Sequence, residues 1–189
     1  IVCEGALQHG EDQEAVLAYA QERGCEFNPE ACWEMAVEKG HVRAMAWIRK
    51  RYDDRVCRWN MWVNGSCALA AKNGQLGALK WLRGQDPPCP WDEKTCAGAA
   101  KGGHIEVLEW LRGQDPPCPW DETTCAYAAH HGHLETLQWL RSQDPPCPWD
   151  ERACAYAAEK GQLETLQWLR SQDPPCPWDE YACACAAEG

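Results

Sequence analysis

The chain has 189 residues, 45% hydrophobic and 25% charged, which is the composition of an ordered protein with a core to bury. Its 18 lysine and arginine residues stand against 29 aspartate and glutamate residues, and the net charge of −11 opposes binding to nucleic-acid phosphates or anionic lipid. No apolar run is long enough to cross a bilayer, so the sequence favours neither a nucleic-acid partner nor membrane insertion.

The N-terminal part of the chain predicts short helices that end at glycines. Residues 3–10 (CEGALQHG) match the second half of a helix that is clearer at 125–132, which makes 1–24 a partial repeat. In the segment CEFNPEAC, Asn28 is suited to cap a helix and Pro29 to occupy its first position.

Two looser repeats follow, over about 25–56 and 57–88. They are joined by an irregular stretch within 49–65, which carries an insertion that includes Trp59 and Trp62. It is the one part of the chain that departs from the repeat, and it stands as a separate candidate for docking a partner.

From residue 89 onward the sequence repeats every 29 residues. The positions that recur at this interval are Cys89, Cys118, Cys147 and Cys176; Cys96, Cys125, Cys154 and Cys183; and Trp91, Trp120, Trp149 and Trp178. The repeats therefore cover 89–117, 118–146 and 147–175, with a partial repeat at 176–189. We expect one continuous array over 1–189, which is itself a fragment of a longer protein.

Each repeat predicts two helices separated by a glycine. In the repeat that starts at Cys118, Asp121 is placed to cap the first helix and Gly132 to end it. Leu137 and Leu140 then lie on the apolar stripe of the second helix, which the Asp-Pro-Pro segment terminates. One such pair cannot bury its own stripe, so we expect an all-α solenoid of stacked helix-turn-helix repeats, with the repeated tryptophans filling its core.

The segment 123–141 (TTCAYAAHHGHLETLQWLR) resembles the ankyrin repeat, in which Ala-Ala-x-x-Gly-His ends the first helix and Leu-Glu opens the second. The CPWDE motif and the tryptophan of the second helix are similar to those of the ankyrin arrays found in algae and other microbial eukaryotes. The resemblance implies a protein-binding scaffold, possibly one subunit of a larger complex, and no enzyme. The period of 29 is shorter than the ~33 of ordinary ankyrin repeats. The segment QDPPCPW stands where the family has a long hairpin finger, so we expect no binding by fingertips.

Positions that vary between repeats are free to serve a partner, whereas positions that stay constant serve the stack. The varying positions of the first helix follow i, i+4 and i+7 spacing, which places them on one helix face. We call them the variable stripe: Lys94, Gly98 and Lys101; Thr123, Tyr127 and His130; Arg152, Tyr156 and Glu159; and Tyr181. In the family that the chain resembles, this face is the concave one.

The cysteines leave two other possibilities open. Each repeat holds two cysteines seven residues apart, such as Cys118 and Cys125, which could form a metal site or a disulfide. Zinc sites favour closer spacing, so the interpretation we prefer is free buried thiols in a reducing, cytoplasmic compartment. A cysteine-based metal or redox module is the alternative function.

The remaining polar residues favour structure over chemistry. Acids such as Asp115 and Asp144 are expected to line the loop edge, and Asp121 and Asp150 to cap helices. No histidine, serine or carboxylate stands apart from the repeat as a catalytic group should. We therefore predict no catalytic, metal or cofactor residues and no cofactor.

Overall fold

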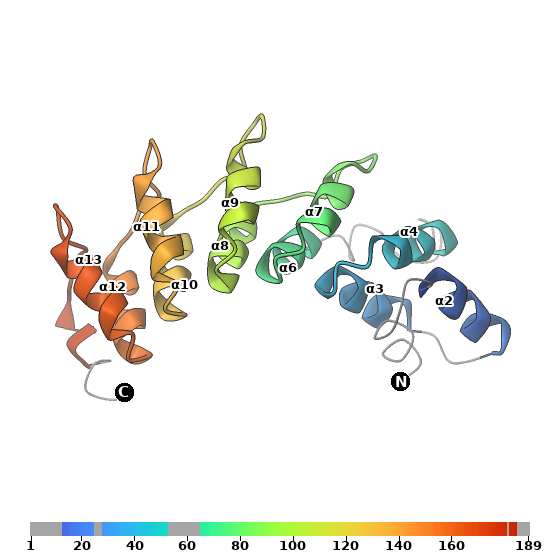
Figure 1. Ribbon diagram of the computed structural model, residues 1–189, viewed down its shortest axis with the longest axis horizontal. Helices are drawn as coiled ribbons and strands as arrows, with labels where there is room; N and C mark the ends of the chain where they lie inside the picture. Colours follow the sequence, from blue (N-terminus) through green and yellow to red (C-terminus); the bar gives the residue numbers. More distant parts are fainter. Residues whose placement is uncertain (1–12, 25–27, 53–64, 181, 185–189) are drawn as a thin grey trace. The chain divides into compact units, whose positions relative to one another are not determined.

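The protein is described from a computed structural model, which defines residues 13–24, 28–52, 65–180 and 182–184 (Figure 1). Throughout these ranges every regular element is a helix, as predicted. The chain forms two compact units, residues 1–90 and residues 91–189. None of the helices in these ranges is long and apolar enough to cross a membrane. The irregular stretch around Trp59 and Trp62 and the stripe position Tyr181 lie outside the described residues.

The first unit is built from short helices that pack in pairs. Its described helices are α2 (Gln13–Glu22), α3 (Pro29–Glu38), α4 (Val42–Arg51), α6 (Ser66–Lys72) and α7 (Leu76–Arg83). The predicted cap is confirmed, because the Asn28 side chain accepts hydrogen bonds from the backbone N–H groups of Glu30 and Ala31 at 3.1 and 3.2 Å. Helix α3 packs on α6, where the buried Trp33 Nε1 donates to Ser66 Oγ at 2.9 Å.

The second unit repeats one helix pair along the chain. Its first helices are α8 (Glu93–Gly102), α10 (Glu122–His130) and α12 (Glu151–Glu159), and its second helices are α9 (Ile105–Arg112), α11 (Leu134–Ser142) and α13 (Leu163–Ser171). The first helices form one row, in which α10 packs between α8 and α12 (Figure 1). Each starts at the predicted aspartate, since Asp92, Asp121 and Asp150 each accept a hydrogen bond from a first-turn backbone N–H at 3.0 to 3.1 Å. The stacked helix-turn-helix architecture is therefore confirmed here.

The turn inside each pair requires glycine. Gly103 and Gly132 have φ angles of 74° and 70°, in the left-handed region that costs other residues strain. The next repeat also crowds this turn, because a Cβ atom on Gly103 would lie 2.9 Å from Nδ1 of His133. That imidazole is held in place by a hydrogen bond of 3.2 Å between its Nε2 and the Lys101 carbonyl oxygen.

Replacing Gly103 with alanine is expected to lower the free energy of unfolding by about 1 to 2 kcal/mol, because the turn is strained and His133 must move. Gly77→Ala is the matched control. Gly77 lies in α7 without a positive φ and with nothing within 4 Å of an added Cβ, so this change should stabilise by about 0.5 to 1 kcal/mol. Urea unfolding of both variants tests the pair, and a shift of the same sign in both would contradict this account of the turn.

The core is made of leucine, alanine and cysteine side chains. In the repeat at 118–146, Leu137, Leu140, Ala128, Ala129 and Cys125 are all 0% exposed. These are the constant positions of the repeat, so the prediction that constant residues serve the stack is confirmed for them.

The expectation that the repeated tryptophans fill the core is wrong. Trp120 and Trp139 are both half-exposed, and their rings meet edge to face with centroids 6.4 Å apart. The contact recurs as Trp91 with Trp110 and as Trp149 with Trp168. Each ring pair therefore lies partly open to solvent, outside the fully buried leucine, alanine and cysteine core.

Arginines at the ends of the second helices hold the QDPPCPW loops. Arg112 donates from Nη1 to the Cys118 carbonyl oxygen at 2.6 Å, while its guanidinium lies 4.0 Å from the centroid of the Trp120 ring. Arg141 makes the same two contacts with Cys147 and Trp149, at 2.6 and 4.0 Å. A charge-assisted hydrogen bond and a cation–π contact therefore fix each loop in the second unit.

Candidate protein-binding face

Side chains of the variable stripe are accessible in the second unit. Lys94, Tyr127 and Glu159 are exposed, and Tyr127 is 38% exposed. The other described members are half-exposed: Gly98, Lys101, Thr123, His130, Arg152 and Tyr156. Constant residues of the same helices, such as Cys125 and Ala128, are fully buried. The stripe positions are therefore the accessible ones, and the constant Cys125 and Ala128 are not. One position departs from this match, because Thr95, Thr124 and Ala153 vary between repeats and are nevertheless buried.

Members of the variable stripe touch across successive repeats. The ammonium group of Lys101 in α8 lies 5.6 Å from the ring centroid of Tyr127 in α10. The His130 ring at the end of α10 meets the Tyr156 ring of α12 edge to face, with centroids 5.7 Å apart. The stripe is thus one surface that runs over three helices rather than three separate patches.

An ion pair ties two repeats together at the start of the stripe. Arg152 in α12 lies 3.0 Å from the Glu122 carboxylate of α10 and 2.7 Å from the Asp150 carboxylate. The hydrogen bond to Asp150 raises the pKa of the Arg152 guanidinium, and Glu122 adds to this effect. Glu122 was not among the predicted site residues. Its position one residue after the cap does not vary, so the comparison of repeats could not single it out.

Histidines gather where α10 ends. Nδ1 of His130 lies 3.1 Å from Nδ1 of His131, and the His131 and His133 rings stack with centroids 6.2 Å apart. Partial burial holds the pKa of His130 below its ordinary value, and the neighbouring His131, Lys160 and Lys101 act in the same direction against the opposing Glu159. His130 is therefore largely neutral at pH 7, and it offers the stripe an aromatic and hydrogen-bonding surface rather than a charge.

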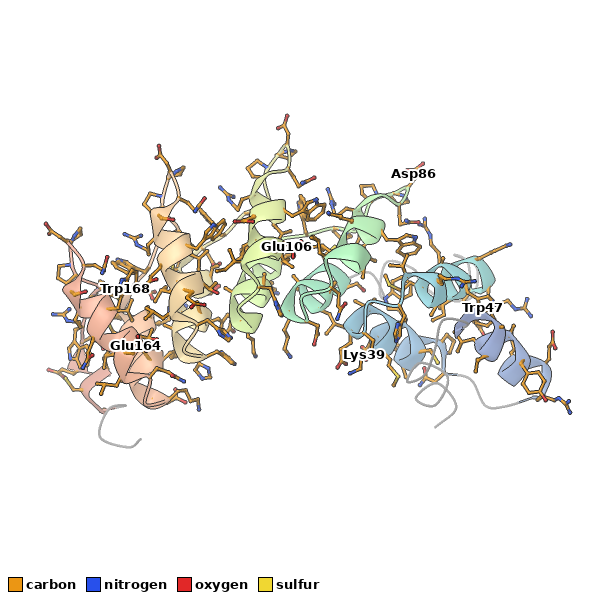
Figure 2. All side chains as sticks on the ribbon, viewed as in Figure 1. Lys39, Trp47, Asp86, Glu106, Glu164 and Trp168 are labelled. Carbon is orange, nitrogen blue, oxygen red and sulfur yellow. The ribbon has the colours of Figure 1, made fainter. Side chains whose placement is uncertain are left out.

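The acids of the loop edge have separate tasks. Asp121 and Asp150 cap helices, whereas Asp115 and Asp144 are exposed in the loops. Figure 2 shows Asp86, their counterpart in the first unit, at the tip of the loop that follows α7. The loop acids therefore belong to the loops between repeats, whereas the described stripe positions lie on the first helices.

The structure brings together cysteines at a spacing other than the seven residues that the sequence left open as an alternative. Cys96 and Cys118 are hydrogen-bonded to one another, as are Cys125 and Cys147, and the members of each pair are 22 residues apart rather than seven. Stacking brings the first-helix cysteine of one repeat against the loop cysteine of the next. Cys32, by contrast, is disulfide-bonded, which overturns for this residue the expectation of free thiols. Among the described residues, no group of three or more histidine, cysteine or acidic side chains could hold a metal ion.

Residues 96–176 match the family model described as ankyrin repeats (3 copies). The matched segment contains every described stripe position except Lys94. The match bears on the family as a whole and not on its cysteine- and tryptophan-rich type. Among curated proteins, no sequence matches the chain.

Proposed function

From the membership of residues 96–176 in the ankyrin repeat family, we propose that this chain is a scaffold that binds a partner protein through the variable stripe. Ankyrin repeats are generally protein–protein interaction modules and are typically not enzymes. The proposal adds which face binds, and it makes the chain a non-enzymatic subunit of a complex. We also propose that the ankyrin-like repeats form one continuous array over residues 1–189.

The observation that carries the proposal is the agreement between variability and exposure along the first helices. Tyr127 and Tyr156 vary between repeats and reach solvent, while the neighbouring Ala128 and Ala157 are constant and buried. A position under no packing constraint can change to suit a partner. Two tyrosines near the centre of such a face are the kind of residue in which binding energy concentrates.

The chemistry of the stripe favours a partner surface of mixed polarity. Lys101 and Arg152 supply positive charge in a chain whose net charge is −11. Lys101 lies beside Tyr127 of the following first helix, and Arg152 lies beside Glu122 of the preceding one. A partner that places a carboxylate near Lys101 and apolar surface on Tyr127 and Tyr156 fits this arrangement. The net negative charge argues against nucleic acid as that partner.

The compartment is the second part of the proposal. Seven described cysteines of the second unit are free thiols, and all of them except Cys183 are buried. Thiols in this number persist where glutathione and thioredoxin keep them reduced. Although Cys32 is disulfide-bonded, the larger number of thiols supports a reducing cytoplasmic location for the working state.

The test replaces Tyr127 and Tyr156 together with alanine and compares this variant with Asp115→Asn/Asp144→Asn. The partner is first identified by pull-down with the intact chain and proteomics, and its affinity is then measured by calorimetry. Loss of each tyrosine is expected to weaken binding by about 30-fold, since central aromatic residues often contribute about 2 kcal/mol each. The loop variant should change affinity little and should alter mainly the association rate.

Two results would contradict the proposal. A larger loss of affinity in the loop variant would move the interface to the loop edge. A partner that docks on the stretch around Trp59 and Trp62, unaffected by either change, would make the repeats a spacer. Circular dichroism of the tyrosine variant should match that of the unmodified chain, because both side chains lie outside the core.

A further inference from the structure

Four pairs of buried cysteines lie between successive repeats. Cys67 in α6 donates its thiol hydrogen to Sγ of Cys89 at a sulfur–sulfur distance of 3.0 Å. The equivalent pairs are Cys96 with Cys118, Cys125 with Cys147, and Cys154 with Cys176. In every pair the partners are 22 residues apart, so each joins a first helix to the loop that begins the next repeat.

A second hydrogen bond holds the loop cysteine against the preceding repeat. The Cys118 thiol donates to the Asp92 carbonyl oxygen at 3.5 Å, and the Cys147 thiol donates to the Asp121 carbonyl oxygen at 3.5 Å. From the other side, the Cys96 thiol lies 3.8 Å from the Cys118 carbonyl oxygen. Both sulfurs of a pair are therefore held at the same point of the seam between repeats.

We propose that each pair is a dithiol site that forms a disulfide between successive repeats by exchange with a small disulfide such as oxidised glutathione. One thiolate attacks the glutathione disulfide, which gives a mixed disulfide and releases one glutathione thiol. The second thiolate attacks the protein sulfur of the mixed disulfide, which forms the cysteine–cysteine bond and releases the second glutathione. The protein loses two electrons and two protons, and one oxidised glutathione becomes two reduced molecules.

Access to these buried sulfurs comes from the loop. Pro87, Pro88 and Pro90 around Cys89 are exposed, so a local opening that breaks the hydrogen bond from Arg83 to the Cys89 carbonyl oxygen would expose the sulfurs to the oxidant. The hydrogen bond from Cys67, together with the Arg83 guanidinium, holds the pKa of the Cys89 thiol below its ordinary value, which favours the reactive thiolate. The hydrogen bond with Cys176 and the Arg170 guanidinium lower the pKa of the Cys154 thiol in the same way, so we expect the pairs that contain Cys89 and Cys154 to react before the other two.

In the first unit, a cysteine at the equivalent position of a first helix is disulfide-bonded. Cys32 lies four residues after the cap Asn28, as Cys125 lies four residues after Asp121, and Cys32 is disulfide-bonded. A cysteine at this position of the first helix is thus compatible with a disulfide in the fold.

The experiment maps disulfides in the intact chain after incubation with oxidised glutathione, blocking of free thiols, and tryptic digestion at acidic pH. Pairing at 22 residues links peptide 59–72 to 84–94, and peptide 153–160 to 171–189. It also joins 95–101, 113–141 and 142–152 into one three-peptide species. Pairing at seven residues would instead link 84–94 to 95–101 and would leave 113–141 unlinked, with its own internal disulfide.

Two single variants act as reciprocal controls within one peptide. Cys118→Ser should release 95–101 from the three-peptide species, whereas Cys125→Ser should release 142–152 and keep 95–101. Oxidation should raise the midpoint of thermal unfolding by ~5 °C or more, reversibly with dithiothreitol. The exposed Cys183, whose Sγ accepts a hydrogen bond from Trp178 Nε1, reports that the oxidant is active by forming a mixed disulfide.

Linkage at seven residues would overturn the proposal. So would unlinked peptides when Cys183 is fully modified, because the pairs would then be packing contacts only. The map of the unsubstituted chain decides the matter even if a variant fails to fold, and neither result depends on the partner-binding stripe.

Discussion

Replacing Leu137 with alanine is expected to lower the free energy of unfolding by about 2 to 5 kcal/mol. The side chain is 0% exposed and lies in α11, on the face that packs within its own repeat. Removing it leaves a cavity that the fixed helix pairs can close only in part. Urea unfolding followed by circular dichroism measures the change.

Tyr127→Ala is the matched comparison, because Tyr127 lies in α10 of the same repeat and is 38% exposed. Replacing Tyr127 should lower the free energy of unfolding by about 0.5 kcal/mol. Trp139→Ala should fall between the two, since the indole ring is half-exposed and packs on Trp120. Equal losses for Leu137 and Tyr127 would show that the buried and exposed faces of the repeat are assigned wrongly.

The second large effect is expected at Arg141. Arg141→Gln removes the charge-assisted hydrogen bond to the Cys147 carbonyl oxygen and the cation–π contact with Trp149, and it should lower the free energy of unfolding by about 2 kcal/mol. The loop between repeats loses its attachment to the helix, so the substitution destabilises the packing between two successive helix pairs.

Arg152→Gln provides the control for charge and side-chain length. Arg152 makes its ion pairs with Glu122 and Asp150 at the surface, where such pairs contribute about 0 to 1 kcal/mol. Salt should reduce this small effect and leave that of Arg141 nearly unchanged, because the Arg141 contacts are short and stacked. A larger loss from Arg152 than from Arg141 would mean that the loop is held by other contacts.

Much of the fold follows from local sequence. Asp121 and Gly132 act within one turn of the backbone, by capping the first helix and by adopting a positive φ, so the residues themselves predict both helix ends. Burial of the constant Ala128 and exposure of the variable Tyr127 follow from helical periodicity within one repeat, so comparison of the repeats also predicts the two faces.

Contacts between repeats were decided by the tertiary structure. The spacing of seven between Cys118 and Cys125 left a pair open as an alternative to free thiols. Stacking instead sets Cys125 against Cys147 of the next loop, at a separation that no pattern within one repeat shows. Hydrophobicity alone predicts Trp120 as a core residue. In the structure the guanidinium of Arg112, from the preceding repeat, packs on the Trp120 ring, which stays partly exposed. Sequence periodicity predicts which face of a single helix is buried. The path of the chain between helices sets which side chains of different repeats meet.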